Sequence, residues 1–232
     1  MKLNKYIDHT LLKPEATATD IEKLCLEAKQ YEFASVCVNP TYVSLAYELL
    51  QDTNVNVCVV VGFPLGANIT ETKIMEITNA LHDGASEIDM VMNISQFKSN
   101  NYDLVADEMR ACKKAAGEAV VKVIIETCLL SDTEIIKACQ LAEQAGIDFV
   151  KTSTGFSKAG ATTGNVKLMK ETVGQRLQVK AAGGIRSKAN VLAMIEAGAT
   201  RIGTSGGVAI MQDEARNTKF HIFVDKSLKF LE

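Results

Sequence analysis

The chain has 232 residues, of which 47% are hydrophobic and 23% charged, with a formal net charge of −3. This size and composition are typical of globular proteins with one large domain or two small ones, and they allow a sizeable core without disulfides. The densest basic run is Lys113-Lys114. Charge therefore argues against a protein that binds nucleic acid or an anionic membrane, and we expect neither partner.

Targeting and metal-binding signals are absent from the sequence. The most apolar stretch, Val55–Phe63, is too short to span a bilayer, and the N-terminal MKLNKYIDHT lacks the apolar core of a secretory signal. The six cysteines have no CxxC spacing and lie mostly in apolar runs, which indicates a reduced, cytoplasmic protein. The three histidines, at positions 9, 82 and 221, are far apart, so we expect no zinc site and no metal.

Short β-branched runs alternate with amphipathic stretches along almost the whole chain. Several runs are apolar nearly throughout, as parallel strands covered on both faces are. The predicted strands are Tyr6–Leu11, Ala34–Val38, Val55–Phe63, Glu87–Met92, Val120–Glu126, Phe149–Ser153, Gln178–Ala182 and Arg201–Thr204.

Helix start and stop signals separate these strands. Thr19-x-x-Glu22 and Ser131-x-x-Glu134 have the spacing of capping boxes, each followed by apolar residues at helical intervals. Glycines follow three of the helical stretches, where a residue with positive φ is wanted: Gly84, Gly146 and Gly198.

The order of elements predicts an α/β fold, a closed (β/α)8 TIM barrel that forms a single domain over residues 1–232. Each strand but the last is followed by a clear helix, and no Pro/Ser-rich linker interrupts the series. A doubly wound open sheet is the alternative. That fold usually has a GxGxxG turn after its first strand, and none occurs here.

Charged residues gather in or just after the predicted strands, where a barrel places its active site. Charges within apolar strands are unfavourable unless they are paired, so several together are a stronger signal than one. Each residue alone also has a structural interpretation: Asp89 as a hydrogen-bond acceptor, Lys122 as an ion-pair partner of Asp89 or Glu126, and Lys151 reaching solvent along its apolar stem. The candidates are Asp8, Thr10, Asp89, Lys122, Lys151, Thr152 and Lys180.

Glycine-rich loops follow the last two predicted strands, as Ala182-Gly183-Gly184-Ile185 and Gly203-Thr204-Ser205-Gly206-Gly207. Loops at these positions frequently form the phosphate site of a barrel, because glycine lets backbone N–H groups approach the phosphate oxygens. Ser205 adds a hydroxyl donor. The pair of loops predicts a phosphorylated ligand.

A lysine at the end of the sixth strand suggests covalent chemistry. An unperturbed lysine has a pKa near 10.4, which desolvation and a second cation both lower. We expect Lys180 to lie against Lys151 and to favour its neutral form. A neutral Lys151 could then condense with an aldehyde or ketone to give an iminium.

Eight motifs together resemble the deoxyribose-phosphate aldolase family: IDHTLLKP, SVCVNP, VVVGFPLG, EIDMVMN, VKVIIET, FVKTSTGF, VKAAGGIR and IGTSGG. They occur in that family's order and span residues 7 to 207. The resemblance implies reversible cleavage of 2-deoxy-D-ribose 5-phosphate to D-glyceraldehyde 3-phosphate and acetaldehyde, without a metal or another cofactor. It also implies a place in deoxyribonucleotide catabolism and a homo-oligomer, either a dimer or a tetramer.

The same resemblance assigns roles to individual residues. It implies that Lys151 is the Schiff-base lysine, that Lys180 tunes it, and that Asp89 handles protons through a water molecule. It further implies that Cys37 lines the pocket, with a structural role as the alternative. The residues implied to hold phosphate are Gly183, Gly184, Gly203, Ser205 and Gly206.

The sequence departs from some family members in two places. Phe156 follows the KTSTG glycine where a phosphate-binding lysine occurs in those members, and Lys158 lies nearby. No tyrosine occurs after Tyr102, whereas other members have one at the extreme C-terminus.

Three other functions are compatible with parts of this pattern. One is an iminium-forming aldolase or transaldolase with a different sugar phosphate, and product analysis would separate it. Another is a sugar-phosphate sensor without catalysis, although a sensor has no evident need for Lys151, Lys180 and Asp89 together. The third is a metal-dependent aldolase, which the scarce, scattered histidines disfavour.

Overall fold

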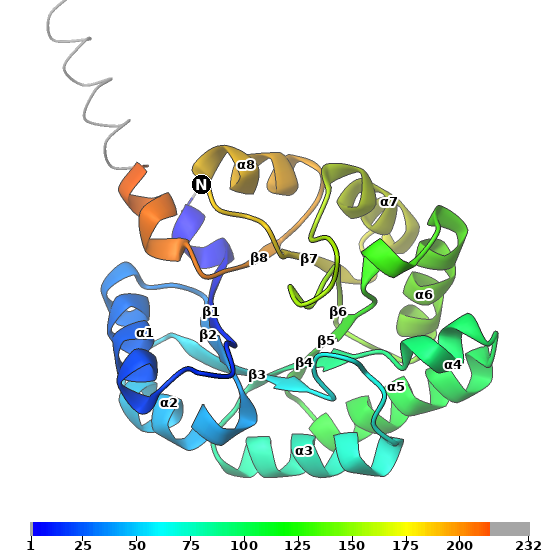
Figure 1. Cartoon of the computed structure of the whole chain (residues 1–232), viewed down its shortest axis with the longest axis horizontal. Coiled ribbons are helices and arrows are strands. Elements are labelled where there is room, and N and C mark those ends of the chain that lie inside the picture. The colour runs from blue at the N-terminus through cyan, green and yellow to red at the C-terminus, as the bar shows by residue number, and fades with distance from the viewer. Residues whose placement is uncertain (1, 214–232) are drawn as a thin grey trace, which may run out of the picture.

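Eight parallel strands form a closed barrel in chain order, with the last strand paired to the first. The computed structural model describes residues 2–213, and Figure 1 looks into the ring of strands. The predicted single-domain (β/α)8 barrel is confirmed. The strands are β1 (Ile7–Leu11), β2 (Ser35–Val38), β3 (Asn56–Val61), β4 (Glu87–Val91), β5 (Val120–Ile124), β6 (Phe149–Lys151), β7 (Gln178–Ala182) and β8 (Arg201–Thr204).

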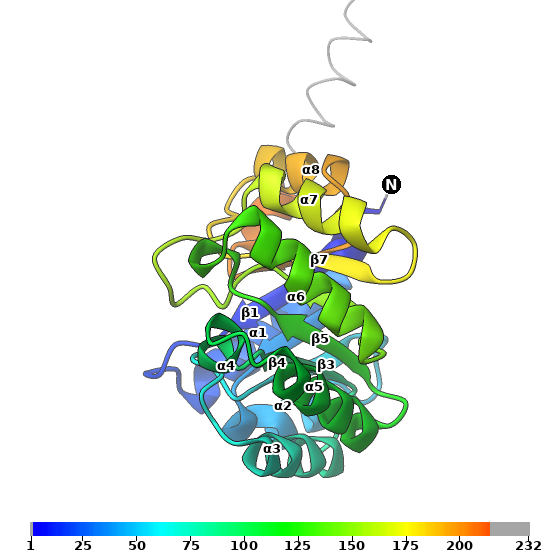
Figure 2. The same cartoon turned by 90° about the vertical axis from the view of Figure 1, so that its right-hand side faces the viewer.

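Helices cover the outside of the barrel, and Figure 2 shows α6 and α7 side by side on its flank. A further helical segment begins at Gly207, after β8. The α-helices are α1 (Ala18–Tyr31), α2 (Val43–Leu50), α3 (Thr70–His82), α4 (Ile94–Lys98), α5 (Tyr102–Ala116), α6 (Asp132–Gln144), α7 (Thr163–Val173) and α8 (Lys188–Glu196). Short 3₁₀ helices are η1 (Leu3–Tyr6), η2 (Pro40–Tyr42) and η3 (Thr127–Leu129).

Period-two alternation along the strands sorts their side chains into two sets. On β4, Ile88 and Met90 join the apolar layer between strands and helices, whereas Glu87 and Asp89 point into the barrel. Lys122 on β5 also points inward. This alternation explains how charges can stand between apolar neighbours in a buried strand. A small apolar group completes the interior: Leu12, Cys37, Cys58 and Val60, with Phe63 packed against it.

The first predicted capping box is wrong by two residues. Helix α1 begins at Ala18, so Thr17 is the N-cap, and its side chain accepts from the backbone N–H of Asp20 while the Asp20 carboxylate accepts from the backbone N–H of Thr17. Thr17–Asp20 and Thr19–Glu22 both have the spacing of a capping box, and the first of them caps the helix. The Ser131–Glu134 box on α6 is confirmed.

The glycines predicted to follow helices adopt positive φ, as expected. At Gly198 φ is 111°, and an added Cβ would lie 2.5 Å from the Lys170 side chain. Several strands are one or two residues shorter than predicted; Tyr6, for example, ends η1 instead of starting β1. In residues 2–213, no helix combines the length and apolar character needed to cross a membrane. The six cysteines are all free thiols.

Candidate active site

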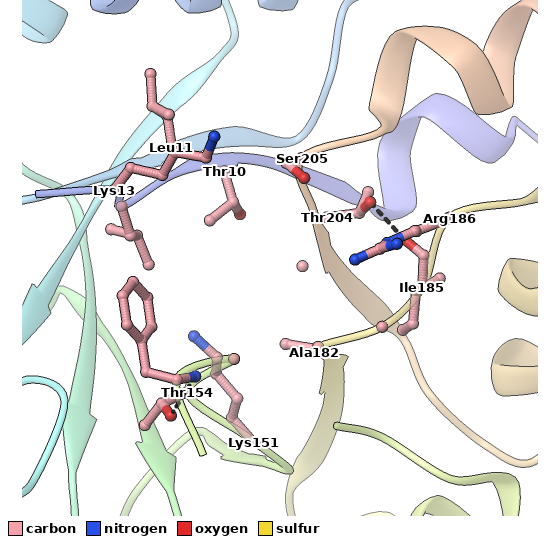
Figure 3. A pocket seen from close by; sticks show the side chains of 16 residues that line it. Thr10, Leu11, Lys13, Lys151, Thr154, Ala182, Ile185, Arg186, Thr204 and Ser205 are labelled. Carbon is pink, nitrogen blue, oxygen red and sulfur yellow. Dashed lines mark hydrogen bonds between the residues drawn. The ribbon is translucent and has the colours of Figure 1, made fainter. Parts of the chain in front are cut away.

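A cavity of about 330 Å³ opens at the carboxyl ends of the strands. Figure 3 shows Lys151 and Ala182 on one side of the opening and Thr10 and Ser205 on the other. Six of the residues predicted from the sequence line this cavity: Thr10, Lys151, Gly183, Gly184, Gly203 and Ser205.

The other predicted site residues do not line the cavity. The charged ones lie within the barrel, and Gly206 lines a neighbouring cavity between β1, α1 and the start of the last helical segment. The complete set is Asp8, Cys37, Asp89, Lys122, Thr152, Lys180 and Gly206.

Asp89 is the point at which three lysines meet. Its Oδ2 accepts from Nζ of Lys151 at 2.6 Å and from Nζ of Lys180 at 2.7 Å. Its Oδ1 accepts from Nζ of Lys122 at 3.0 Å. Lys151 is 3% exposed and the other three side chains are fully buried. Of the three lysines, only Lys151 therefore reaches the cavity.

Strand register explains this difference in depth. Lys151 and Lys180 are directly paired on β6 and β7, and Asp89 and Lys122 are directly paired on β4 and β5. Within the β5–β6 pair, Ile124 is the partner of Lys151. Lys122 therefore lies two residues deeper in the barrel than Lys151.

Two more carboxylates and an arginine extend this arrangement. Asp8 contacts Nζ of Lys180 and the Arg201 guanidinium, both at 2.5 Å. Glu87 contacts Nζ of Lys122 at 2.6 Å and Arg201 at 3.0 Å. We refer to these side chains as the buried charge cluster: Asp8, Glu87, Asp89, Lys122, Lys151, Lys180 and Arg201. Its carboxylates come from β1 and β4, and its cations come from β5 to β8.

The pairing keeps members of the buried charge cluster ionised. Burial alone would raise the pKa of Asp89, but the three ammonium groups around it hold that pKa well below its usual range. Burial likewise opposes ionisation of Asp8, yet Lys180 and Arg201 lower its pKa. Burial would lower the pKa of Lys180, but Asp8 and Asp89 raise it above the ordinary value. Lys180 is therefore an ammonium ion at neutral pH.

Two cysteines lie beside Asp89, on the directly paired positions of β2 and β3. The Cys58 thiol donates to Asp89 Oδ1 at 3.1 Å, and burial raises the pKa of Cys58. The neighbouring Cys58 side chain lowers the pKa of Cys37. The candidate ligand atoms of Cys37, Cys58 and Asp89 lie within 4.8 Å of one another, the spacing of a metal site. Both oxygens of Asp89 already face ammonium groups, which repel a cation, so these residues fit a metal ion poorly.

The two glycine-rich loops lie next to each other at the cavity mouth, because they follow the paired strands β7 and β8. Gly183 and Gly184 have φ of 85° and 78°, a conformation that other residues rarely adopt. Gly183 also packs on Gly160, whose Cα lies 2.9 Å from the position of an added Cβ. The backbone N–H of Gly206 donates to Thr204 Oγ1 at 2.9 Å, so this N–H already has a partner.

Residues next to Lys151 shape the loop that follows β6. Thr152 is buried, and its hydroxyl donates to the Ala182 carbonyl. Thr154 donates to Glu126 through its hydroxyl and its backbone N–H. Glu126 therefore contacts this loop. Of the two ion-pair partners expected for Lys122, Asp89 and Glu126, the structure shows Asp89. Phe156 lines the cavity, where its ring packs edge-on against Phe63 at 5.3 Å between centroids.

Sequence reasoning missed several charged residues of the site. Arg186 and Lys13 line the cavity and are exposed, on opposite sides of the opening in Figure 3. Arg186 directly follows the Gly-Gly motif, a signal that could have identified it. Glu87 and Arg201 begin their strands, where a polar residue is ordinary, and nothing local in the sequence singles them out.

A barrel with a buried lysine facing a cavity, and with glycine loops after β7 and β8, has the features of an enzyme that acts on a phosphorylated carbonyl compound. A profile described as DeoC/LacD family aldolase matches residues 2–213. The chain belongs to the DeoC/LacD aldolase family and is a lyase.

Curated and solved relatives agree with this assignment. The deoxyribose-phosphate aldolase of Streptococcus sanguinis (strain SK36) is 61% identical over 214 residues, covering 92% of this chain and 97% of the relative. The solved structure of "QR15, an Aldolase" is 44% identical with a TM-score of 0.91, covering 94% of this chain and 98% of that one. A structure described as tetrameric, deoxyribose phosphate aldolase from Aeropyrum pernix, is 35% identical with a TM-score of 0.86, covering 92% and 91%.

Proposed function

We propose that this protein reversibly cleaves 2-deoxy-D-ribose 5-phosphate to D-glyceraldehyde 3-phosphate and acetaldehyde through a Schiff base on Lys151. One observation carries the proposal: Lys151 is the cluster lysine that reaches the cavity, while its Nζ rests on Asp89 2.6 Å away. The shared name of the close relatives supports the choice of substrate.

The chemistry follows from an amine beside a buried proton acceptor. Neutral Lys151 attacks C1 of the open-chain aldehyde, and loss of water gives an iminium. Removal of the C3 hydroxyl proton breaks the C2–C3 bond; C3 becomes the aldehyde carbon of glyceraldehyde 3-phosphate and the electron pair moves into an enamine. Protonation of C2 and hydrolysis release acetaldehyde. We assign the proton transfers to Asp89 through a water molecule, and Lys180 keeps a positive charge against the amine.

Phosphate binding is assigned to the loops after β7 and β8. Ser205 supplies a hydroxyl, and the flanking glycines allow the phosphate to approach the backbone. Arg186 adds a cation that sequence reasoning did not identify. Phe156 takes the position of the lysine found in some relatives and makes that wall apolar. The assigned glycines are Gly183, Gly184, Gly203 and Gly206.

The same proposal covers cofactor requirement, the supporting residues, the location of the protein and its assembly. The iminium accepts the electron pair of the broken bond, so the reaction requires no metal or other cofactor. Asp8, Thr10, Cys37, Lys122 and Thr152 surround the substrate or support the residues that do. We place the protein in the cytoplasm, in deoxyribonucleotide catabolism, as a homo-oligomer; the Aeropyrum pernix relative is described as tetrameric. The segment HIFVDKSLKFLE, which lacks the tyrosine, lies outside the described residues.

Borohydride trapping tests the nucleophile. Incubation with acetaldehyde and borohydride should inactivate the protein and leave a reduced adduct on the peptide that contains Lys151. The Lys151→Ala variant should lose both aldol cleavage and this inactivation. Lys158→Ala, which removes an exposed lysine seven residues later, is the matched control and should keep both. An adduct on Lys180 or Lys122 would contradict the assignment.

Product analysis tests the substrate. Cleavage of 2-deoxyribose 5-phosphate should release acetaldehyde in an amount equal to glyceraldehyde 3-phosphate. A trapped lysine without acetaldehyde release would indicate an aldolase or transaldolase for a different sugar phosphate.

A further inference from the structure

The buried charge cluster contains a closed ring of alternating charges. Around the ring, each carboxylate lies between two cations and each cation between two carboxylates. The successive contacts are Asp89–Lys122 at 3.0 Å, Lys122–Glu87 at 2.6 Å, Glu87–Arg201 at 3.0 Å, Arg201–Asp8 at 2.5 Å, Asp8–Lys180 at 2.5 Å and Lys180–Asp89 at 2.7 Å. Lys151 is attached to the ring at Asp89 but is not a member of it.

The ring is neutral as a whole, because three carboxylates balance two ammonium groups and one guanidinium. A protonated Lys151 therefore gives the buried charge cluster a surplus positive charge. Loss of one proton from Lys151 restores neutrality. Loss of a proton from Lys122 or Lys180 would also restore neutrality, but it would take a cation from two carboxylates, whereas Lys151 leaves only Asp89 with one cation fewer.

We propose that Glu87 and Arg201 are positioning residues that act on Lys151 through this charge balance, although neither lines the cavity. They close the ring at the amino ends of β4 and β8. The inference rests on the proposed role of Lys151 as the Schiff-base lysine. It adds that the whole ring, and not Lys180 alone, selects which lysine becomes neutral.

Other titratable groups around Lys151 are the same in every variant compared below, so they do not affect the direction of the shift. Its barrel neighbours are Asp89 on β4, Lys122 on β5, Lys180 on β7, Asp8 on β1 and the thiols of Cys37 and Cys58 on β2 and β3. Burial holds the Cys58 thiol neutral by raising its pKa. On the cavity side, Lys13 and Arg186 are exposed, so water screens their charges. Glu126 accepts from Thr154 in the loop after β6, and its charge is the same in every variant compared below.

Ring members are also held in their charged forms. The pKa of Lys122 is raised against the effect of burial, chiefly by Asp89, and the pKa of Arg201 is raised by Asp8 and Glu87. Because these groups do not exchange protons near neutral pH, they act as a fixed set of charges. A substitution in the ring changes that set by one unit and should move the titration of Lys151.

Two substitutions test the proposal because they should act in opposite directions. Arg201→Met leaves the ring with one negative charge in excess, so Lys151 should keep its proton to higher pH. Glu87→Gln leaves one positive charge in excess, so Lys151 should lose its proton at lower pH. The measurement is the pH dependence of kcat/KM and of the rate of borohydride trapping with acetaldehyde. We expect the acid limb to move by on the order of one pH unit, upward for Arg201→Met and downward for Glu87→Gln.

Two further variants separate charge from structure. Arg201→Lys keeps the charge and should leave the acid limb in place. The double variant Glu87→Gln/Arg201→Met is balanced again and should return the limb toward that of the unmodified protein. If Arg201→Met does not fold, Glu87→Gln decides: a downward shift supports the proposal, and an unmoved limb overturns it.

The outcomes distinguish this inference from the proposed function. If the acid limb of the pH profile stays in place, or moves in the same direction in both single variants, the charge-balance role is overturned. Trapping on Lys151 would still support the proposed function. An adduct on another lysine in the unmodified protein overturns the proposed function itself.

Discussion

Three lysines of the barrel interior differ in their partners more than in their burial. Lys122 and Lys180 each contact two carboxylates, whereas Lys151 contacts one within residues 2–213, that of Asp89. A lysine between two carboxylates is held as an ammonium ion, and an ammonium ion is not a nucleophile. The number of acidic partners thus separates the candidate nucleophile from its neighbours.

Arg186 offers a test of the phosphate site. Arg186→Met should lower kcat/KM for 2-deoxyribose 5-phosphate about tenfold or more, because a hydrogen bond to a charged group contributes roughly 1.5–3 kcal/mol. Activity toward unphosphorylated deoxyribose should change little, and steady-state kinetics on the two substrates is the measurement. Lys167→Met, at an exposed lysine of α7, should affect neither. Equal losses on both sugars would mean that Arg186 does not contact phosphate.

For single residues, the sequence indicates the three lysines and Asp89, because charges between apolar strand residues are conspicuous. It could not choose the partner of Lys122, since both Asp89 and Glu126 were available. The structure resolves this through register: Asp89 is paired directly with Lys122, while Glu126 lies beyond the end of β5 and accepts from Thr154. Pairing across strands is long-range information that one sequence does not contain.

Helix α3 carries a fourth buried lysine, which the proposed chemistry does not use. Lys73 donates to the carbonyl oxygens of Gly66 and Val91 at 2.9 Å each and to Glu108 on α5 at 2.7 Å. Val91 is the last residue of β4, the strand that carries Asp89. Lys73 thus ties the loop after β3, the end of β4 and helix α5 together.

Removing this lysine should destabilise the protein strongly. Lys73→Met leaves Glu108 buried without its cation and two carbonyls without a donor, so we expect the free energy of unfolding to fall by about 3–5 kcal/mol. Urea denaturation is the measurement. Lys167→Met, at the exposed Lys167–Glu171 pair, is the control and should change it by no more than about 0.5 kcal/mol. If Lys73→Met lowered the free energy of unfolding as little as Lys167→Met, the contacts of Lys73 would not be what holds the loop after β3.

The ends of elements were less predictable than their presence. Thr17 and Thr19 each have an acidic residue three positions later, and only the path of the chain from β1 into α1 decides between them. Strand ends were overextended for a similar reason: Phe63 and Ser153 follow buried strands but belong to loops of the site. Local propensity cannot separate a strand residue from an apolar or buried loop residue.

For the whole molecule, alternation of strands and helices was sufficient to predict the barrel. Closure was an inference from the count of strands, and the pairing of β8 with β1 confirms it. The ring of buried charges depends on that closure, because the Arg201–Asp8 contact joins the last strand to the first. Glu87 and Arg201 could not be recognised before the barrel was closed.

Division of the cluster between β1–β4 and β5–β8 has a consequence for chain fragments. If the protein is cut in the segment between α5 and β5, one piece retains only the carboxylates of the interior and the other only its cations. Two copies of the same piece would have to face like charges inside a shared barrel, whereas the two different pieces attract each other. We expect residues 1–117 and 118–232, refolded together, to assemble one to one and not with themselves, as native mass spectrometry can determine. Self-pairs in comparable yield would contradict this expectation. One-to-one assembly would mean that charges inside the barrel, and not its outer surface, select the other half of the chain over a second copy of the same half.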